Sequence, residues 1–118
     1  MALLGFHFSQ KYCQPLLQGV KHATVLHNQH YFYPQQKILV YCSKEENLLN
    51  GQEEKRIGWA IVQEVKITTV NQLTESDAIS CGEKNLNSLK QSLQQWYQTQ
   101  DNSIVTLVKF QFSPSEQD

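Results

Sequence analysis

The sequence has few of the features that mark disulfide-rich or membrane-spanning proteins. Its 118 residues hold 3 cysteines, an odd number without a C-x-x-C pair, which argues against a disulfide scaffold and a cysteine-rich zinc site. No window approaches the roughly 20 apolar residues of a membrane span, and the N-terminal MALLGFHF lacks the basic start of a signal peptide. We therefore expect no membrane partner, a cytoplasmic location by default, and Cys13, Cys42 and Cys81 as small buried hydrophobic residues.

An excess of charge of one sign is also missing. Ten Lys and Arg residues stand against eleven Asp and Glu, for a formal net charge of −1, and Arg56 is the single arginine. Without the last six residues the balance is ten against nine, which is weakly permissive of an anionic ligand. Because phosphate neutralisation dominates affinity for long nucleic acids, this composition disfavours tight binding to long RNA. No DNA partner is expected.

The length of the chain fits one compact domain, and its hydrophobic pattern predicts a mixture of strands and helices. Strands are expected at 6–8, 23–26, 37–42, 56–70 and 104–112, and helices at 14–18, 74–80 and 86–96. Strand 37–42 is too continuously apolar to alternate, so we expect it to be buried on both faces. Without regular β/α alternation, the order predicts an α+β fold: a small mixed β-barrel with two or three helices packed on its outside. Residues 1–112 should form the domain and 113–118 a flexible tail.

Several residues mark the ends of these elements. Gly19 fits the position just past a helix, where a left-handed conformation is wanted, and Thr74 with Asp77 resembles a capping box. Gly58 is expected at a bulge or a barrel corner. Trp59 and Trp96 both lie on apolar stripes, so they are expected in the core rather than stacked on a ligand.

The stretch GVKHATV places Lys21 and Thr24 where a helix should end and a strand begin. Residues three apart in a regular strand point to opposite faces, so the two share a site only if the chain bends near Gly19. Burial would then lower the basicity of the lysine, and a neutral amine can take the hydroxyl proton so that the threonine attacks an amide carbonyl. A plainer interpretation stays open, because a lysine at a helix end and a threonine in a strand need no catalytic role.

Four segments in order resemble the ASCH domain, a PUA-like β-barrel: LLQGVKHAT, GWAIVQEVKITTVNQLTESDA, LKQSLQQWY and VTLVKFQF. Gly-x-Lys-x-x-Thr after a short helix is the signature of that family, and the likeness covers about residues 6–112. Within the family, the chain is most similar to bacterial proteins that remove the acetyl group from N4-acetylcytidine. The resemblance implies a hydrolase without a cofactor, acting on a small modified nucleoside. An RNA-binding module without catalysis and a ribonuclease are the alternatives.

The resemblance also implies roles for individual residues. Thr24 would be the nucleophile and Lys21 the base that activates it. A carboxylate from the segment after LTE completes the family's site; strict register places Cys81 there, and one inserted residue brings in Glu83, which we expect to be the acid. The family usually carries an arginine two residues after the threonine. Leu26 stands there instead, so the natural bidentate partner of a phosphate or carboxylate is missing.

Four further residues are candidates for substrate contact. His27 could replace the missing arginine in part, and Tyr31 could stack on a base. Lys44, at the start of the polar loop 43–55, could meet phosphate, and Gly19 provides the bend. No metal site is expected, because HNQH (27–30) has two histidines without a nearby acidic partner. The expected partners are a small modified nucleoside or RNA, and the oligomeric state is not indicated.

Overall fold

The computed structural model describes residues 5–43 and 54–114. Five strands occur in these ranges: β1 (Gly5–Phe8), β2 (Ala23–His27), β3 (Lys37–Ser43), β4 (Glu54–Thr69) and β5 (Ile104–Pro114). The helices are α1 (Cys13–Leu17), α2 (Glu75–Ser80) and α3 (Leu86–Tyr97), with short 3-10 helices η1 (Gln10–Tyr12) and η2 (Val70–Gln72). Strand β5 runs two residues beyond the end expected from the sequence pattern.

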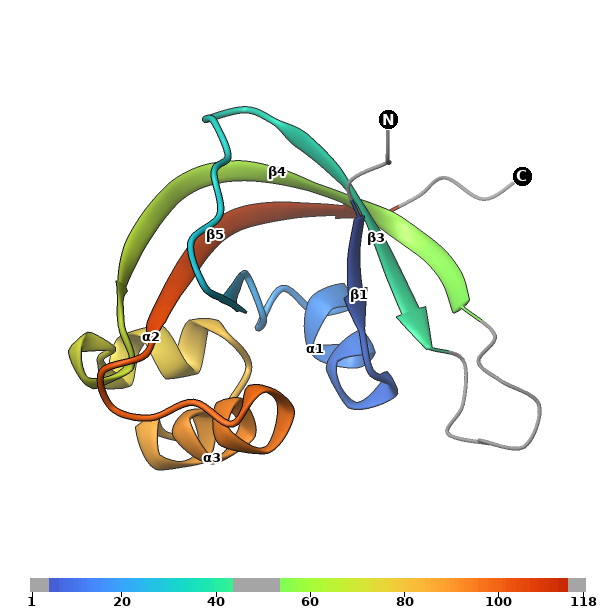
Figure 1. The fold of residues 1–118 in the computed structure, drawn as a ribbon. Helices are drawn as coiled ribbons and strands as arrows, with labels where there is room; N and C mark the ends of the chain where they lie inside the picture. Colours follow the sequence, from blue (N-terminus) through green and yellow to red (C-terminus); the bar gives the residue numbers. More distant parts are fainter. Residues whose placement is uncertain (1–4, 44–53, 115–118) are drawn as a thin grey trace.

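The five strands form one mixed sheet in the order β1-β3-β4-β5-β2. Strand β1 pairs with β3 in parallel, and every other pairing is antiparallel. Figure 1 shows β4 and β5 bending together over the helices, so that the sheet curls into a half-barrel. Helices α2 and α3 pack together at one end, and α1 contacts β5. The predicted α+β architecture, a small mixed sheet that curls towards a barrel with helices packed on it, is confirmed.

Two irregularities in β4 produce the bend. The register shifts between Val40 and Tyr41 of β3, opposite Gly58, and again between Val62 and Glu64 on the β5 side. Extra residues at such points bend a strand and increase its twist. A Cβ at Gly58 would overlap the backbone carbonyl oxygen of Ser113 and lie 2.8 Å from the ring of Phe112, so this close approach of β5 requires glycine. The predicted bulge or corner at Gly58 is confirmed.

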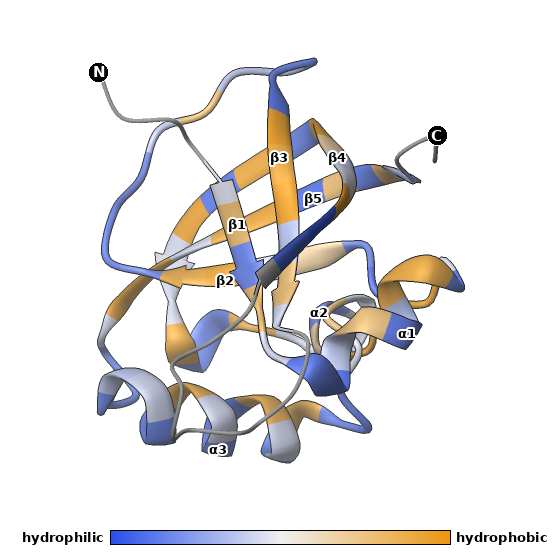
Figure 2. Cartoon of the chain, turned by 90° about the vertical axis from the view of Figure 1, so that its right-hand side faces the viewer, coloured by the Kyte–Doolittle hydropathy of each residue, from blue (hydrophilic) through white to orange (hydrophobic). Residues whose placement is uncertain are grey.

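Side chains on the two faces of β5 enter two separate cores. One core fills the half-barrel and includes Phe6, Val40, Val62 and Phe110, and the other lies between the sheet and helices α2 and α3. Figure 2 shows β3 and β5 as mainly hydrophobic strands, whereas α3 alternates hydrophobic and hydrophilic residues. The continuous apolar run of β5 follows from this arrangement, because both faces of the strand are covered.

Strand β3 differs from the expectation of burial on both faces. Ile38, Val40 and Cys42 are buried in the half-barrel, while Leu39 and Tyr41 on the other face are only half-buried. No described helix of the second core, which faces β2 and β5, reaches this face of β3. The apolar residues of β3 therefore alternate between core and partial exposure, as in a sheet that is covered on one side.

Local signals at two helix ends behave as predicted. Gly19 has a φ of 80° just beyond α1, and the amides of Gly19 and Val20 donate to the carbonyls of Leu16 (3.1 Å) and Pro15 (2.9 Å). This is the Schellman arrangement, in which a left-handed residue ends the helix. At α2, the Thr74 and Asp77 capping box is complete.

The cysteine and tryptophan expectations need correction. Cys13 and Cys42 form a disulfide, with their Cα atoms 6.0 Å apart, because parallel pairing places Phe8 beside Cys42 and the chain turns back into α1 shortly afterwards. Only Cys81 is a free buried cysteine among the described residues. Trp59 is half-buried and Trp96 is 46% exposed, so neither is a core residue. Within the described ranges, none of the helices is long and apolar enough to cross a membrane.

Candidate functional site

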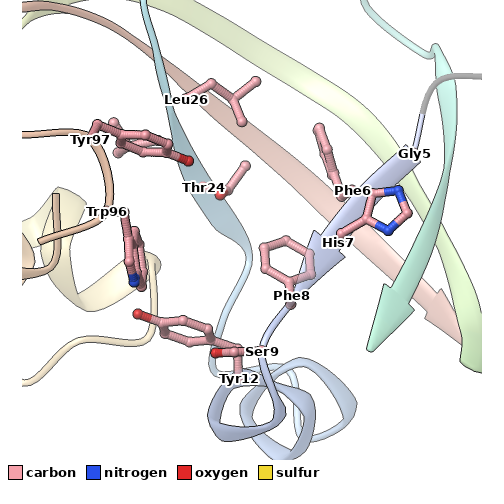
Figure 3. Close-up of a pocket in the computed structure, with 11 residues that line it drawn as sticks. Gly5, Phe6, His7, Phe8, Ser9, Tyr12, Thr24, Leu26, Trp96 and Tyr97 are labelled. Carbon is pink, nitrogen blue, oxygen red and sulfur yellow. The ribbon is translucent and has the colours of Figure 1, made fainter. Parts of the chain in front are cut away.

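The half-barrel is open between its two edge strands, β1 and β2, and a pocket lies at this opening. Its volume is about 320 Å³. Residues of β1 and η1 form one side, Thr24, Val25 and Leu26 of β2 form another, and Trp96 and Tyr97 at the end of α3 lie across from them (Figure 3). The pocket therefore lies between the unpaired edges of β1 and β2. Strand β1 is hydrogen-bonded to β3 on its other edge, and β2 to β5.

A smaller cavity adjoins this pocket. It measures about 30 Å³, shares the residues Phe8, Tyr12, Thr24, Val25 and Trp96 with the larger pocket, and is lined in addition by Lys21, Cys81, Glu83 and two leucines of α3. That volume accommodates one or two water molecules. Lys21, Thr24 and Glu83 come from three separate segments of the chain, and all three line this cavity.

Lys21 is almost fully buried, with 3% of its surface exposed. Its Nζ donates to the carbonyl oxygens of Cys81 (2.7 Å) and Ala23 (2.9 Å) and lies 4.6 Å from the ring centre of Tyr12 and 5.0 Å from that of Phe8. Burial lowers the pKa of Lys21 from 10.5 to about 8, although nearby Cys81 and Glu83 act in the opposite direction. A neutral amine has two N–H groups, so the two carbonyls would occupy both and leave its lone pair available.

Thr24 is the second residue of β2 and pairs with Val108 of β5. Its neighbours Ala23 and Val25 belong to the core against α2 and α3, so strand alternation directs Thr24 to the other face. Figure 3 shows the side chain in the pocket between Phe8 and the aromatic residues of α3. Lys21 precedes the strand rather than lying in it, and this is how the two side chains reach one cavity despite their spacing.

Three hydroxyl groups hold the Glu83 carboxylate. The Tyr12 hydroxyl donates to Oε2 at 2.7 Å, Ser92 donates to Oε2 at 3.1 Å and Ser88 donates to Oε1 at 2.8 Å. Burial raises the pKa of Glu83, but these hydrogen bonds and the positive charge of Lys11 outweigh it, and the net pKa is lowered. Glu83 is therefore ionised at neutral pH.

Three of the four predicted contact residues, Gly19, His27 and Tyr31, lie outside these two cavities. Gly19 lines a different surface pocket, on the other side of Lys21. His27 stacks on Tyr97, with 5.2 Å between ring centres, and Tyr31 is 77% exposed. Lys44 falls outside the described residues. The structure thus brings the three predicted catalytic residues together, and it does not bring Gly19, His27 or Tyr31 to the same cavities. The roles of all seven predicted residues stay predictions.

Sequence reasoning missed most of the surroundings of Glu83. Ser88 and Ser92 lie four apart on α3, a spacing that places two side chains on one helix face, and this was the only available signal for them. Tyr12 carries no motif at all. Among the described residues, no group of three or more His, Cys, Asp or Glu side chains could hold a metal ion.

Comparison with known proteins supports the fold. No family model matches the sequence, and no curated protein matches it significantly. A crystal structure of protein EF3133 from Enterococcus faecalis V583, described under the family model DUF984, matches all of this chain and 86% of its own, with a TM-score of 0.66 and 13% identity. An ASCH domain from Lactobacillus crispatus JV V101 matches 93% of this chain and 81% of its own (TM-score 0.65, 14% identity).

A third neighbour is the S128A mutant of ZmASCH from Zymomonas mobilis. It matches 93% of this chain and 72% of its own, with a TM-score of 0.58 and 16% identity. The TM-scores of these three structures establish a common fold, and at such identities the likeness concerns the fold alone. The described chain, with its curled five-stranded sheet and its helices, therefore has the PUA-like fold of the ASCH-domain proteins.

Proposed function

We propose that this protein is an amidohydrolase that removes the acetyl group from N4-acetylcytidine or a related modified nucleoside. One observation carries the proposal: Lys21, Thr24 and Glu83 line a single small cavity that shares lining residues with a larger pocket. A base, a nucleophile and a fixed carboxylate next to a ligand-sized space are the parts that amide cleavage through a covalent intermediate needs.

In the proposed reaction, neutral Lys21 takes the hydroxyl proton of Thr24, directly or through one water. The Thr24 oxygen attacks the acetyl carbonyl carbon, and the bond from that carbon to the N4 nitrogen breaks. The Lys21 ammonium returns its proton to the leaving amine, which yields cytidine and an acetyl ester on Thr24. Lys21 then takes a proton from water, the hydroxide attacks the ester carbonyl carbon, and the bond from that carbon to the Thr24 oxygen breaks. The Lys21 ammonium returns its proton to the Thr24 oxygen, and acetate leaves.

The larger pocket suits a flat, uncharged ligand. Its volume lies at the lower end of the range of about 300–1,000 Å³ for small-molecule sites, and its walls include the rings of Phe6, Phe8, Tyr12, Trp96 and Tyr97. None of the described residues that line it is Lys or Arg, and Leu26 occupies the position where the family usually has arginine. A nucleoside without phosphate therefore fits these walls better than a nucleotide.

An RNA-binding module without catalysis is the second candidate. The specific observation in its favour is the exposure of Trp96 at the end of α3, because an exposed aromatic side chain can stack on the bases of a single strand. The low positive charge of the chain argues against this candidate, since backbone phosphates dominate such affinity.

The test is to incubate the protein with N4-acetylcytidine and to measure cytidine and acetate by chromatography. Thr24→Ala should abolish turnover. Thr68→Ala is the matched control, because Thr68 lies half-buried in β4 outside both cavities. A parallel RNA titration at two salt concentrations separates the candidates: no turnover, together with tight and strongly salt-dependent binding, would replace the enzyme by the RNA-binding module.

A further inference from the structure

Tyr12 contacts both Glu83 and Lys21 of the proposed site. Its hydroxyl donates to Glu83 at 2.7 Å, and its ring lies 4.6 Å below the Lys21 nitrogen. The same ring packs against Phe8 and Trp96 and lines both cavities. It is buried. Among the described residues, Tyr12 alone both donates a hydrogen bond to Glu83 and places its ring next to the Lys21 nitrogen.

We propose that Tyr12 is a positioning residue which, with Ser88 and Ser92, fixes Glu83 as an ionised hydrogen-bond acceptor for an N–H group of the substrate. The proposal rests on the proposed amidohydrolase function. It assigns Glu83 the task of accepting a hydrogen bond, and it leaves all proton transfer to Lys21.

Counting donors and acceptors leads to this assignment. An ionised carboxylate offers about four lone-pair positions, and the hydroxyls of Tyr12, Ser88 and Ser92 occupy three of them. Because all three neighbours donate, Glu83 carries no proton that it could give to a leaving group. One acceptor position is left for a ligand in the cavity, and a secondary amide such as the proposed substrate presents an N–H donor for it.

Charged and titratable neighbours support the ionised form. Lys11 of η1 contributes a positive charge to Glu83, and Lys21 interacts with it from the segment before β2. Cys81 at the end of α2 is buried, and its burial raises the pKa of the thiol to about 11. Burial, together with the Glu83 carboxylate, raises the pKa of Tyr12, so its hydroxyl stays protonated and keeps donating.

The position of Tyr12 is set by the backbone around it. It ends η1, directly before Cys13, whose disulfide to Cys42 connects α1 to β3. The ring also packs edge-on against Phe8, with 6.3 Å between ring centres. Removing the hydroxyl alone should therefore leave the ring in place, so Tyr12→Phe tests the hydrogen bond rather than the packing.

The experiment follows the Glu83 side-chain carboxyl carbon by NMR during an acid titration of the labelled protein, which needs no activity. In Tyr12→Phe the pKa of Glu83 should rise, because one donor to its charged form is lost. Tyr33→Phe is the matched control, since Tyr33 is exposed and outside both cavities; it should titrate like the unmodified protein. Should Tyr12→Phe fold poorly, Ser88→Ala removes another donor from the same carboxylate and should raise the same pKa.

Activity gives the second readout. With N4-acetylcytidine, Tyr12→Phe should lower kcat/KM by about 10- to 100-fold, the usual effect of losing a hydrogen bond to a charged group. The rise of turnover near pH 8, which depends on the pKa of Lys21, should stay in place. A protein that never hydrolyses the substrate refutes the proposed function, while the NMR titration still tests the role of Tyr12 on Glu83. An unchanged Glu83 titration in a folded Tyr12→Phe protein would overturn the positioning role.

Discussion

Burial of Lys21 should make the stability of the protein depend on pH above neutrality. The pKa of Lys21 is about 8 in the folded chain against 10.5 for a free lysine, a difference of 2.5 units. At about 1.36 kcal/mol per unit, this corresponds to about 3 kcal/mol of unfolding free energy. Between these two pKa values the unfolded chain binds more protons than the folded one, so the free energy of unfolding rises with pH through this window and is lowest below it.

The substitution that isolates this effect is Lys21→Met, which keeps an unbranched apolar stem and cannot titrate. We expect the free energy of unfolding of the unmodified protein minus that of Lys21→Met to increase by about 3 kcal/mol between pH 7 and pH 10.5. Urea unfolding at several pH values, followed by tryptophan fluorescence, measures both proteins. Groups that do not interact with Lys21 titrate alike in both and cancel.

Lys66→Met is the matched control, because Lys66 lies exposed on β4. The difference in free energy of unfolding between the unmodified protein and Lys66→Met should change little between pH 7 and pH 10.5. If the difference in free energy of unfolding between the unmodified protein and Lys21→Met also does not change with pH, then Lys21 is not desolvated in solution. The argument that it acts as a neutral base near pH 8 would then be wrong.

Four further predictions concern activity and packing. Turnover of N4-acetylcytidine should rise with pH through about 8 and then level off in a pH–rate profile, because Lys21 must lose its proton. Thr24→Ser should keep part of the steady-state turnover that Thr24→Ala loses, since the hydroxyl remains with a freer rotamer. Gly58→Ala should cost about 1–3 kcal/mol in urea unfolding, because the new Cβ would lie 2.8 Å from an aromatic ring. Thr106→Val should cost about 1–3 kcal/mol in the same assay, because the buried Thr106 hydroxyl accepts a hydrogen bond from the amide of His30 and donates one to the carbonyl of Asn28.

Each of these four has a contrary outcome. Turnover that does not vary between pH 7 and pH 9 would remove Lys21 as the base, and an active Thr24→Ala would remove the nucleophile. A Gly58→Ala protein of unchanged stability would mean that β5 can move away from β4. Unchanged stability in Thr106→Val would mean that the loop does not depend on this hydroxyl.

Local chemistry made much of the fold predictable. Gly19 ends α1, and Thr74 with Asp77 caps the start of α2. Both signals involve residues within one helical turn, so the local sequence is enough to identify them. What covers the outer face of β3, and which cysteine meets Cys42, depend on how distant segments pack. The hydrophobic pattern of Trp96 is that of a core residue, yet α3 ends at the pocket, and nothing nearby in the sequence indicates this.

The candidate site divides in the same way. Lys21 and Thr24 belong to one short motif, and a single bend brings them together. Glu83 depended on a choice between two registers, and the structure places both residues at the cavity: Cys81 contributes its carbonyl oxygen to Lys21, and Glu83 contributes its carboxylate. Tyr12 could not be found from sequence, because its partner lies on a distant segment and no spacing connects them.

The pairing of β2 with β5 also determines when the site can form. Strand β2, which carries Thr24, is synthesised well before its hydrogen-bonding neighbour β5. Contacts between such distant segments form slowly and leave strand edges unpaired in the meantime. A nascent chain that stops before residue 104 would have most of the chemical groups of the site but no strand to hold Thr24 in place. The proposed site should therefore form only after β5 has been synthesised.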